Sequence, residues 1–404
     1  MQIIRYVVAA AVGLATLAAG SALAQAPKVI RIGAPLELSG KFVAYGAQGQ
    51  RGIEMAVEAF GGSVAGYKLD VLFRDIQSTN QGTVSAMTDL LEKEKVDFVI
   101  GPITSGLVAA AVPAWRQQKA LWIVPGSSAP SFEEAIAKEP LVFHTYPWAY
   151  HYHDGTAKAI AGAIGKGKRV AIVYSDGSYG RSQIQPAKDH YTEAGFEVVA
   201  TELVRENATD MNPVLQKIRL AKPDVLVGIV QTTDGIVLAK QIHVGKLGIP
   251  YLVGTAYPQL QTWSEAVGEA GNGWIGATTY LPGMNAPADK KHPKIFPSMK
   301  DWEAAFTKKY NREPEFLDVT VYTSAAMLFL AIERAGGPDK EKVAKELRNL
   351  GVDTMLGDGK FIPTKGGALN QAFNEMVVYQ REGDKFVTVF PKQFANGQLK
   401  PIKY

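Results

Sequence analysis

Short apolar strands alternate with amphipathic helical segments from residue 28 to about residue 280, and this pattern constrains the fold most. Between the strands, apolar residues repeat with a helical period: Ile53, Ala56, Val57 and Phe60 occupy positions i, i+3, i+4 and i+7. Such alternation predicts an α/β protein whose parallel sheets are covered by helices on both faces. The predicted strands are 29–34, 69–73, 98–100, 121–124, 170–174, 198–203, 225–229 and 251–253.

A repeated motif indicates two copies of one structural unit. Lys95-Val-Asp-Phe-Val-Ile-Gly101 and Lys222-Pro-Asp-Val-Leu-Val-Gly228 each combine a helix end, an aspartate, an apolar strand and a glycine. Both follow a βαβα run of similar length. The break between them is Leu141–Gly155, which is rich in aromatic residues and histidine and has no clear period. We therefore expect two doubly wound parallel-sheet lobes with a cleft between them.

The C-terminal part of the chain has a different pattern. Apolar periodicity predicts helices at 299–310, 317–335 and 340–350. The last predicted element is a hairpin around 381–385, because short β-branched and aromatic runs lie on both sides of that segment.

The N-terminus has the features of an export signal. Arg5 gives a short basic start, an apolar stretch runs from Tyr6 to Leu23, and Ala22-Leu23-Ala24 forms the pattern after which a signal peptidase cuts. We therefore predict a signal peptide at 1–24 and a mature protein in the periplasm. An uncleaved leader that anchors the protein is the alternative, and the small residues at its end argue against it. The remaining chain is long enough for two domains of about 150–200 residues each.

Composition excludes several classes of protein. The 404-residue chain has a net charge of only +4, and its lysines and arginines are dispersed, so we expect no nucleic-acid partner. The chain has no cysteines, which excludes disulfides and a lipidated cysteine. Beyond the leader, no apolar run approaches the roughly 20 residues that a membrane-spanning helix needs. We therefore expect a soluble monomer.

The sequence lacks the common motifs of catalysis and cofactor binding. It contains no Gly-x-Ser-x-Gly nucleophile turn and no Gly-x-x-x-x-Gly-Lys-Ser/Thr phosphate loop. His151, His153 and Asp154 could supply metal ligands, but a polar helix start is the commoner origin of such a cluster. We therefore predict no enzyme activity, no cofactor and no metal.

Two loops rich in small hydroxyl residues directly follow predicted strands. They are 101–106, Gly-Pro-Ile-Thr-Ser-Gly, and 125–128, Pro-Gly-Ser-Ser. Open parallel sheets bind ligands at the carboxyl ends of their strands. Hydroxyls and free N–H groups at a helix start suit a carboxylate or a phosphate. Ordinary capping by Thr104 or Ser105 is the alternative that needs no ligand.

Several segments occur together in the order and spacing of one protein family. They are Ile30-Arg-Ile-Gly33 with Ser39-Gly40 and Tyr45-Gly46, Asp97-Phe-Val-Ile-Gly-Pro102, Pro125-Gly-Ser-Ser128, Arg169-Val-Ala-Ile-Val-Tyr174 with Tyr179-Gly180, and Lys222-Pro-Asp-Val225. Over nearly all of its length beyond the leader, the chain resembles the periplasmic substrate-binding proteins of branched-chain amino acid ABC transporters, the leucine/isoleucine/valine-binding family. The resemblance implies two α/β lobes joined by three crossovers, here 28–145 with 280–365 and 146–279 with 366–404.

The resemblance also implies a ligand site in the cleft between the lobes. Ser105, the backbone at Gly126 and the hydroxyl of Ser128 would bind the carboxylate of the ligand. Tyr45 would lie at the mouth of the cleft, and Tyr179 would reach across from the second lobe.

Two positions of this implied site depart from the family pattern. Gln231 stands where the family often has an aromatic residue. Ala256 stands where the family usually has an acidic residue that pairs with the ligand ammonium. An unpaired buried ammonium costs several kcal/mol, which argues against an ordinary α-amino acid. Asp234, in a neighbouring loop, could replace the missing carboxylate.

The stretch 146–153 adds a second hint about the ligand. It contains Trp148, Tyr150 and Tyr152, and aromatic rings beside a cleft suit a flat apolar ligand such as a benzoate or a cinnamate. Packing around the hinge is the alternative explanation. We therefore expect a hydrophobic or aromatic monocarboxylate, or else a branched-chain amino acid, with Trp148 and Tyr150 as candidate contacts.

Export, the lack of catalytic motifs and the resemblance together predict an extracytoplasmic receptor of an ABC importer. It would close its lobes around a small carboxylate by hinge motion and deliver this solute to permease subunits in the inner membrane. A periplasmic sensor that passes ligand occupancy to a signalling partner is the alternative, and a periplasmic hydrolase is third. The lack of a fused signalling domain favours transport.

Overall fold

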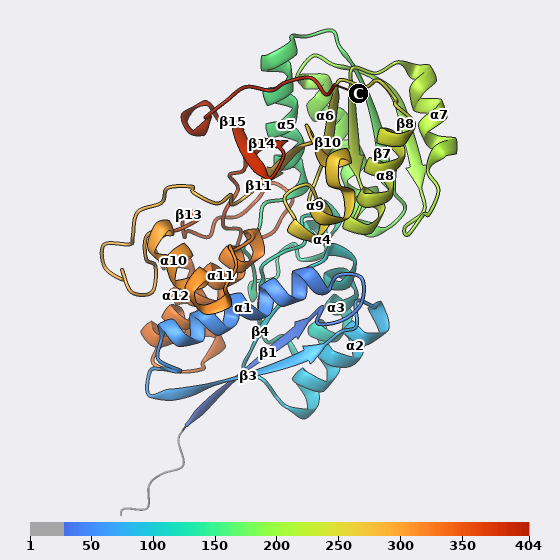
Figure 1. The fold of residues 1–404 in the computed structure, drawn as a ribbon. Helices are drawn as coiled ribbons and strands as arrows, with labels where there is room; N and C mark the ends of the chain where they lie inside the picture. Colours follow the sequence, from blue (N-terminus) through green and yellow to red (C-terminus); the bar gives the residue numbers. More distant parts are fainter. Residues whose placement is uncertain (1–27, 404) are drawn as a thin grey trace, which may run out of the picture.

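The structure, a computed structural model, describes residues 28–403, and the predicted leader at 1–24 lies outside these residues. The described chain forms two α/β lobes, each built on its own sheet (Figure 1). The N-terminal strands lie in the lower lobe of this view, and the green and yellow elements form the upper lobe. The predicted fold class, two α/β lobes with mainly parallel sheets, is confirmed.

The first sheet has the strand order β2-β3-β1-β4-β5-β6. All its pairs are parallel except β2 with β3. The neighbouring strands β4 and β5 are buried along their whole length, as expected for parallel strands covered on both faces. The strands are β1 (Val29–Leu36), β2 (Ser63–Val64), β3 (Tyr67–Asp75), β4 (Phe98–Ile100), β5 (Leu121–Val124) and β6 (Val142–His144).

The second sheet has the order β15-β14-β11-β10-β9-β7-β8 and is parallel from β8 to β11. The predicted C-terminal hairpin is confirmed as an antiparallel pair that extends this sheet at one edge. The strands are β7 (Arg169–Ser175), β8 (Glu197–Val204), β9 (Val225–Ile229), β10 (Tyr251–Gly254), β11 (Ile275–Thr278), β14 (Val377–Glu382) and β15 (Lys385–Phe390). A separate small pair joins β12 (Asp353–Thr354) to β13 (Gly357–Asp358).

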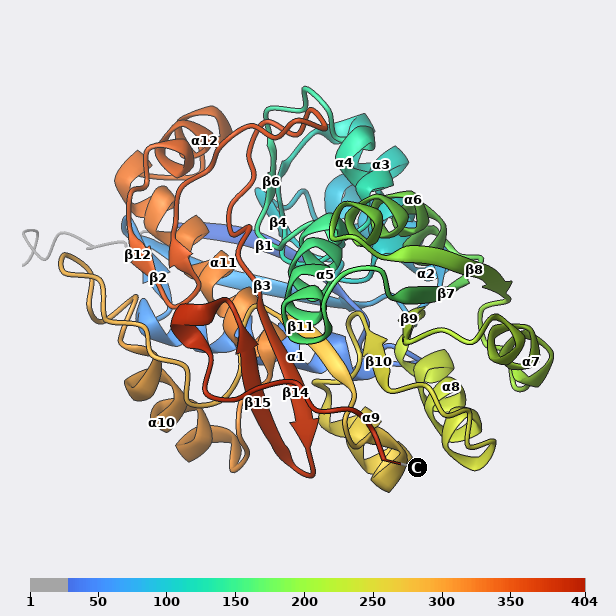
Figure 2. The same ribbon diagram turned by 90° about the horizontal axis from the view of Figure 1, so that it is seen from above.

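Helices flank both sheets, as the view from above shows (Figure 2). In the first lobe, α1 (Val43–Ala59) packs along α11 (Phe316–Ala335), so closely that a Cβ at Gly52 would lie 2.8 Å from the backbone nitrogen of Tyr322. The other helices are α2 (Asn80–Thr88), α3 (Ser105–Gln118), α4 (Pro130–Ala135), α5 (Ala149–Ile164), α6 (Ser178–Glu193), α7 (Asn212–Ala221), α8 (Thr232–Val244), α9 (Gln261–Val267), α10 (Met299–Tyr310), α12 (Lys340–Arg348) and the short η1 (Asp89–Lys93), η2 (Gly268–Gly271) and η3 (Lys392–Phe394).

α11 is a core helix with an unusually apolar composition. Among the described residues it is the one helix long and apolar enough to cross a membrane, and 94% of its most apolar stretch is buried inside the protein. The expectation that no such run follows the leader is therefore wrong, and burial on all sides accounts for the composition. A capping box between Glu315 and Asp318 starts the helix, and Asp318 also pairs with Arg51 of α1 at 2.8 Å.

The segment 141–155, in which the sequence has no clear period, is ordered into β6 and the first turns of α5. β6 has only three residues, all of them buried, and this is too short for an alternating pattern to be recognised. The start of α5 has aromatic residues and histidines on more than one face, which hides its helical period. β11 and α4 also lack a counterpart among the predicted elements, and both are similarly short.

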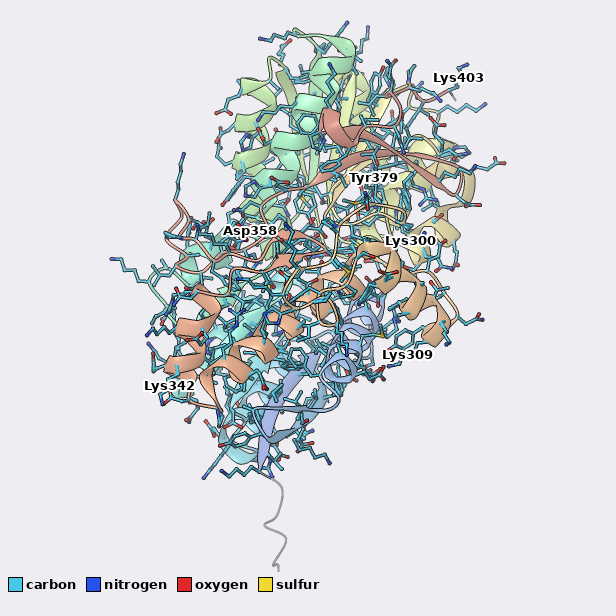
Figure 3. The ribbon with its side chains drawn as sticks, turned by 90° about the vertical axis from the view of Figure 1, so that its left-hand side faces the viewer. Lys300, Lys309, Lys342, Asp358, Tyr379 and Lys403 are labelled. Atoms are coloured by element: carbon cyan, nitrogen blue, oxygen red, sulfur yellow. The ribbon has the colours of Figure 1, made fainter. Side chains whose placement is uncertain are left out.

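The chain passes between the lobes three times, after β6, after β11 and before β14. The predicted residue boundaries of the lobes stay a prediction. Basic side chains are spread over the surface: Figure 3 labels Lys300, Lys309, Lys342 and Lys403 at separate places, whereas Tyr379 is buried. The topology brings the loops that follow the parallel strands together at the junction of the two lobes.

Candidate ligand-binding site

A cavity lies between the lobes, where the loops after β4, β5, β7, β9 and β10 come together. The empty space between its lining atoms is about 370 Å³, which includes space open to solvent. None of the lining side chains carries a formal charge. The lining residues are Tyr45, Ile103, Thr104, Ser105, Gly126, Ser127, Ser128, Tyr146, Tyr152, Tyr179, Gln231, Ala256, Phe316 and Leu317.

The structure brings together every residue that the sequence assigned to the main site. These residues come from both lobes and from six different loops or helices, and all of them line this cavity. They are Tyr45, Ser105, Gly126, Ser128, Tyr179, Gln231 and Ala256. Their contacts with a ligand stay a prediction.

The loop 126–128 forms a wall rich in unused hydrogen-bond donors. Gly126 is required there, because a Cβ would lie 2.4 Å from the backbone oxygen of Ile103. The Oγ of Ser127 is buried and has no hydrogen-bond partner within the described chain. The backbone N–H groups of Gly126, Ser127 and Ser128 also donate to no acceptor among residues 28–403. Unpaired buried donors are costly, so this wall suits an anion with several lone pairs.

The start of α3 forms the adjoining part of the wall. Ser105 is its first residue, where free N–H groups and the helix dipole favour a negative charge. Thr104 does not cap the helix through its side chain, so that alternative is not supported. Instead, Thr104 donates its N–H at 2.9 Å and its hydroxyl at 3.0 Å to one carboxyl oxygen of the buried Glu37. Burial raises the pKa of Glu37.

His144, the last residue of β6, supports the loop 126–128 from behind. Its Nε2 lies 2.7 Å from the carbonyl oxygen of Gly126 and 3.1 Å from that of Ser127. Its Nδ1 lies 2.6 Å from Oε1 of Gln371. The imidazole ring stacks on Trp148 with 3.8 Å between centroids, and burial lowers the pKa of His144 to about 4. These contacts fix the direction in which the loop carbonyls point.

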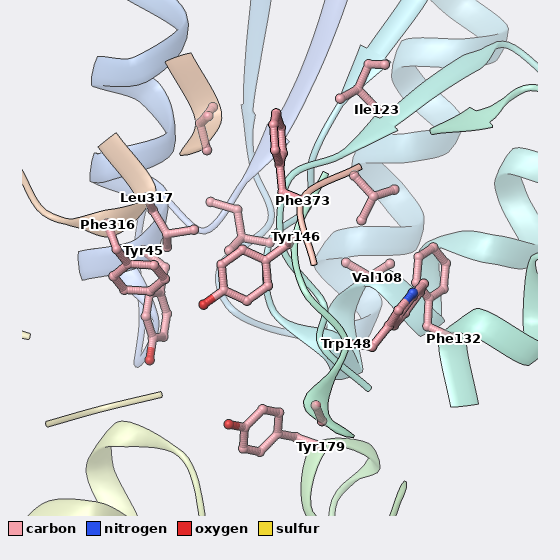
Figure 4. Packing of buried hydrophobic residues seen from close by; sticks show 14 of the residues in the cluster. Tyr45, Val108, Ile123, Phe132, Tyr146, Trp148, Tyr179, Phe316, Leu317 and Phe373 are labelled. Carbon is pink, nitrogen blue, oxygen red and sulfur yellow. The ribbon is translucent and has the colours of Figure 1, made fainter. Parts of the chain in front are cut away.

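Tyrosine rings supply much of the remaining cavity wall (Figure 4). The Tyr45 hydroxyl lies 2.8 Å from that of Thr232 in the other lobe, and Tyr179 donates at 2.7 Å to a threonine of its own lobe. The hydroxyls of Tyr146 and Tyr152 bond to each other. Burial raises the pKa of all four tyrosines, which therefore stay neutral. With their hydroxyls paired, they offer mainly ring surface to a ligand.

Two aromatic residues expected as candidate contacts lie outside this cavity. Trp148 is fully buried between His144 and Phe132, apart from the cavity tyrosines in Figure 4. The Tyr150 hydroxyl is directed at Glu133, at 3.5 Å. Packing around the hinge, the alternative explanation, accounts for both of them.

Asp234 also lies outside the cavity. It occupies the first turn of α8, is only 1% exposed, and has one carboxyl oxygen without a partner among the residues described. Its carboxyl faces the backbone N–H groups of Asn207 and Ala208, and burial raises its pKa to about 6. Asp234 is therefore turned toward the 206–208 loop and does not replace the carboxylate missing at Ala256.

Several lining residues were not assigned to the site from sequence. Tyr146 and Tyr152 line the cavity from the aromatic stretch, and Ser127 from the hydroxyl loop. Phe316 and Leu317 belong to the start of α11, far along the chain, and no local pattern links them to the cleft. The aromatic stretch 146–153 was a usable signal for Tyr146 and Tyr152, but the sequence does not indicate which rings of this stretch face the cavity.

Polar contacts join the lobes around the cavity. Besides Tyr45 with Thr232, Lys41 lies 3.9 Å from Glu206, with both side chains about one-third exposed. These contacts cross from the first lobe to the second, so the structure represents a closed cleft.

The histidine cluster at the start of α5 is separate from this cavity. Asp154 pairs with Lys158 at 2.7 Å, and burial lowers the pKa of His151 to about 4 and that of His153 to about 3. Within the described part of the chain, no group of three or more His, Cys, Asp or Glu side chains could hold a metal ion.

The family of the chain follows from comparison with known proteins. A family model described as periplasmic binding protein matches residues 29–384. The chain belongs to this family. The resemblance drawn from the sequence motifs is thereby confirmed, and the three crossings, two sheets and interlobe cavity are the architecture of a type I periplasmic binding protein.

Individual periplasmic binding proteins match nearly the whole chain. The "Leu/Ile/Val-binding protein homolog 7" of Brucella abortus (strain 2308) is 26% identical over 96% of this chain and 98% of its own length. The leucine binding protein LivK of Thermotoga maritima superposes with a TM-score of 0.76 at 22% identity, covering 89% of this chain and 97% of that one. A solute binding protein from R. palustris in complex with benzoate gives a TM-score of 0.76 at 21% identity, over 92% and 97%.

Proposed function

We propose that the protein is a periplasmic solute receptor of an ABC importer and that its ligand is a hydrophobic or aromatic monocarboxylate. One observation carries the proposal: a wall of unused donors borders a cavity without a charged lining side chain. The N–H groups of 126–128 and the hydroxyls of Ser105 and Ser128 can satisfy a carboxylate. The tyrosine rings can enclose an apolar body.

An α-amino acid suits this cavity less well because it also carries an ammonium group. Ala256 offers no carboxylate, and Asp234 faces the 206–208 loop. Burying an ammonium without a counter-charge costs several kcal/mol. The amide oxygen of Gln231 is a neutral acceptor and offsets only part of that cost.

A branched-chain amino acid is the second candidate. It is favoured by the curated relative named as a Leu/Ile/Val-binding protein and by the structure named as a leucine binding protein. A protein of the same fold holds benzoate. The fold therefore accommodates both classes, and the lining residues decide between them.

A thermal-shift screen tests the ligand class, because a ligand that binds only the folded state raises the melting temperature by mass action. Leucine, isoleucine, valine and phenylalanine are compared with benzoate, hydroxybenzoates and cinnamate at equal concentration. We expect an aromatic acid to give the largest increase. Stabilisation by leucine or valine and by none of the aromatic acids contradicts the argument from Ala256.

The transport role needs a separate test from the ligand class. Deleting the gene should abolish high-affinity uptake of the radiolabelled ligand by intact cells, and a plasmid copy should restore uptake. The periplasmic fraction should contain the protein without residues 1–24, as mass spectrometry of the intact chain can determine. Normal uptake in the deletion strain together with a lost transcriptional response to the ligand would instead support the sensor.

A further inference from the structure

His144 is a buried ionisable side chain whose hydrogen-bond partners are all acceptors. The carbonyl oxygens of Gly126 and Ser127, both near Nε2, can only accept, so Nε2 carries a proton. Nδ1 faces the side-chain oxygen of Gln371 at 2.6 Å. The protonation state of the ring therefore depends on which way the Gln371 amide is turned.

The orientation of the Gln371 amide is fixed by its other contacts. Its Nε2 donates to the backbone oxygens of Tyr146 at 3.0 Å and Ala372 at 2.6 Å. Turning the amide over would place its oxygen against two carbonyl oxygens with no proton between them. Oε1 therefore faces His144, and Nδ1 also has a place for a proton. Only an imidazolium satisfies both nitrogens at once.

Among residues 28–403, no charged side chain of the elements packed around His144 faces its ring. β5 contributes apolar residues, Trp148 covers one ring face, and Glu133 of α4 is directed at Tyr150. Arg348 binds the side chain of Asn370 and not the ring. The shift in the pKa of His144, to about 4, comes from burial opposed by its three hydrogen-bond partners. Without a ligand, the ring is therefore neutral near pH 7. One of its two nitrogens then faces an oxygen acceptor with no proton between them.

The loop connects this ring to the cavity. In a trans peptide the carbonyl oxygen and the next N–H point in opposite directions. Because the oxygens of Gly126 and Ser127 point at His144, the N–H groups of Ser127 and Ser128 point away from it, and both residues line the cavity. A positive charge on the ring polarises these two peptides and strengthens their N–H groups as donors to an anion.

We propose that His144 is the cationic group of the carboxylate subsite and takes up a proton when an anionic ligand binds to the loop 126–128. The inference deepens the proposed function and rests on it, since it requires a carboxylate ligand. The bound negative charge raises the pKa of His144. Affinity is then highest at low pH and falls about tenfold per pH unit between the pKa of the free protein, about 4, and the higher pKa of the complex.

The test measures proton uptake and the charge of the ring in the wild-type protein. The probe is whichever of benzoate, cinnamate, leucine and isoleucine gives the largest thermal shift. Titration calorimetry in buffers of different ionisation enthalpy should report an uptake that grows toward about one proton per ligand as the pH is lowered from 8 to 6. In protein with ¹⁵N-labelled histidine, both ring nitrogens of one histidine should change to imidazolium shifts on binding.

Matched variants locate the proton. His144→Gln should remove the uptake and weaken binding at pH 6 more than at pH 8, whereas His153→Gln, at another fully buried histidine, should retain the uptake. Glu37 and Asp234 are buried carboxyls with raised pKa values near lining residues, so Glu37→Gln and Asp234→Asn should also retain the uptake, whatever their affinity. If His144→Gln does not fold, the wild-type spectra decide.

The outcomes separate this inference from the proposed function. Carboxylate binding with no proton uptake and a neutral ring overturns the role of His144 and leaves the receptor intact. Uptake that disappears in Glu37→Gln or Asp234→Asn and persists in His144→Gln also overturns it. Failure of every carboxylate to stabilise the protein overturns both.

Discussion

Replacing Ser127 by alanine separates ligand binding from structural support, because the two roles predict opposite effects. The hydroxyl of Ser127 is buried in the cavity wall and has no partner in the described structure. If it donates to the ligand carboxylate, Ser127→Ala removes a hydrogen bond to a charged acceptor, which contributes about 1.5–3 kcal/mol. That corresponds to a loss of about 10- to 150-fold in affinity, measurable by titration calorimetry.

The ligand-free protein should not be destabilised by the same change. Ser127 has φ +63°, and alanine meets the same backbone strain as serine at that angle. Removing an unpaired buried hydroxyl also removes a cost, so the melting temperature without ligand should stay the same or rise. Thermal unfolding without ligand measures this effect, and calorimetry on the same sample measures affinity.

Ser324 provides the matched control, since it is a buried serine whose hydroxyl is fully paired. It donates to the backbone oxygen of Thr320 at 2.6 Å and lies 2.7 Å from the hydroxyl of Thr145. Ser324→Ala should lower the ligand-free stability by about 1–3 kcal/mol and leave affinity nearly unchanged. If Ser127→Ala instead behaves like this control, with a lower melting temperature and unaltered affinity, the reasoning about the cavity wall is refuted.

Three further predictions concern the cavity and its closure. Ala256→Asp should supply an ammonium partner, so thermal shifts should increase for leucine relative to benzoate; an unchanged ranking would contradict the charge argument. Gly126→Ala should abolish binding detected by calorimetry, because its Cβ would lie 2.4 Å from the Ile103 oxygen, and retained affinity would mean that the loop can move freely. Lys41→Ala should raise the rate of ligand dissociation in stopped-flow fluorescence only a few-fold. Its 3.9 Å pair with Glu206 is partly exposed, and such pairs contribute about 0–1 kcal/mol. A hundredfold change would show that the pair has a larger part in closing the cleft.

The fold was predictable because its signals are local. A strand such as β9 and a helix such as α10 each contain their own period, and α10 begins and ends at the predicted residues. Alternation of such elements fixes a parallel arrangement, which in turn places the loops 101–106 and 125–128 at the same edge of the first sheet. The position of the donor wall could therefore be predicted from sequence, and the prediction named Ser105, Gly126 and Ser128 but missed Ser127.

The remaining wall could not be predicted, because it depends on contacts between distant segments. Phe316 reaches the cavity only because α11 packs along α1. In the aromatic stretch, Tyr152 faces the cavity and Tyr150 faces Glu133, and this difference depends on where α5 starts. His144 belongs to a three-residue strand, so its position behind the loop has no signal in the sequence.

The position of His144 behind the cavity wall explains how the closed form can be stabilised more with a ligand than without one. A cationic side chain in the cavity itself would lose its hydration whenever the lobes closed, with or without a ligand. His144 lies behind the peptides of 126–128, where burial keeps it neutral until an anion is present. Its charge, and the stronger N–H donors that follow from it, then arise only in the ligand complex. The extra stabilisation of the closed form is therefore reserved for the occupied protein, and in the proposed importer this is the form that a permease would have to distinguish from the empty one.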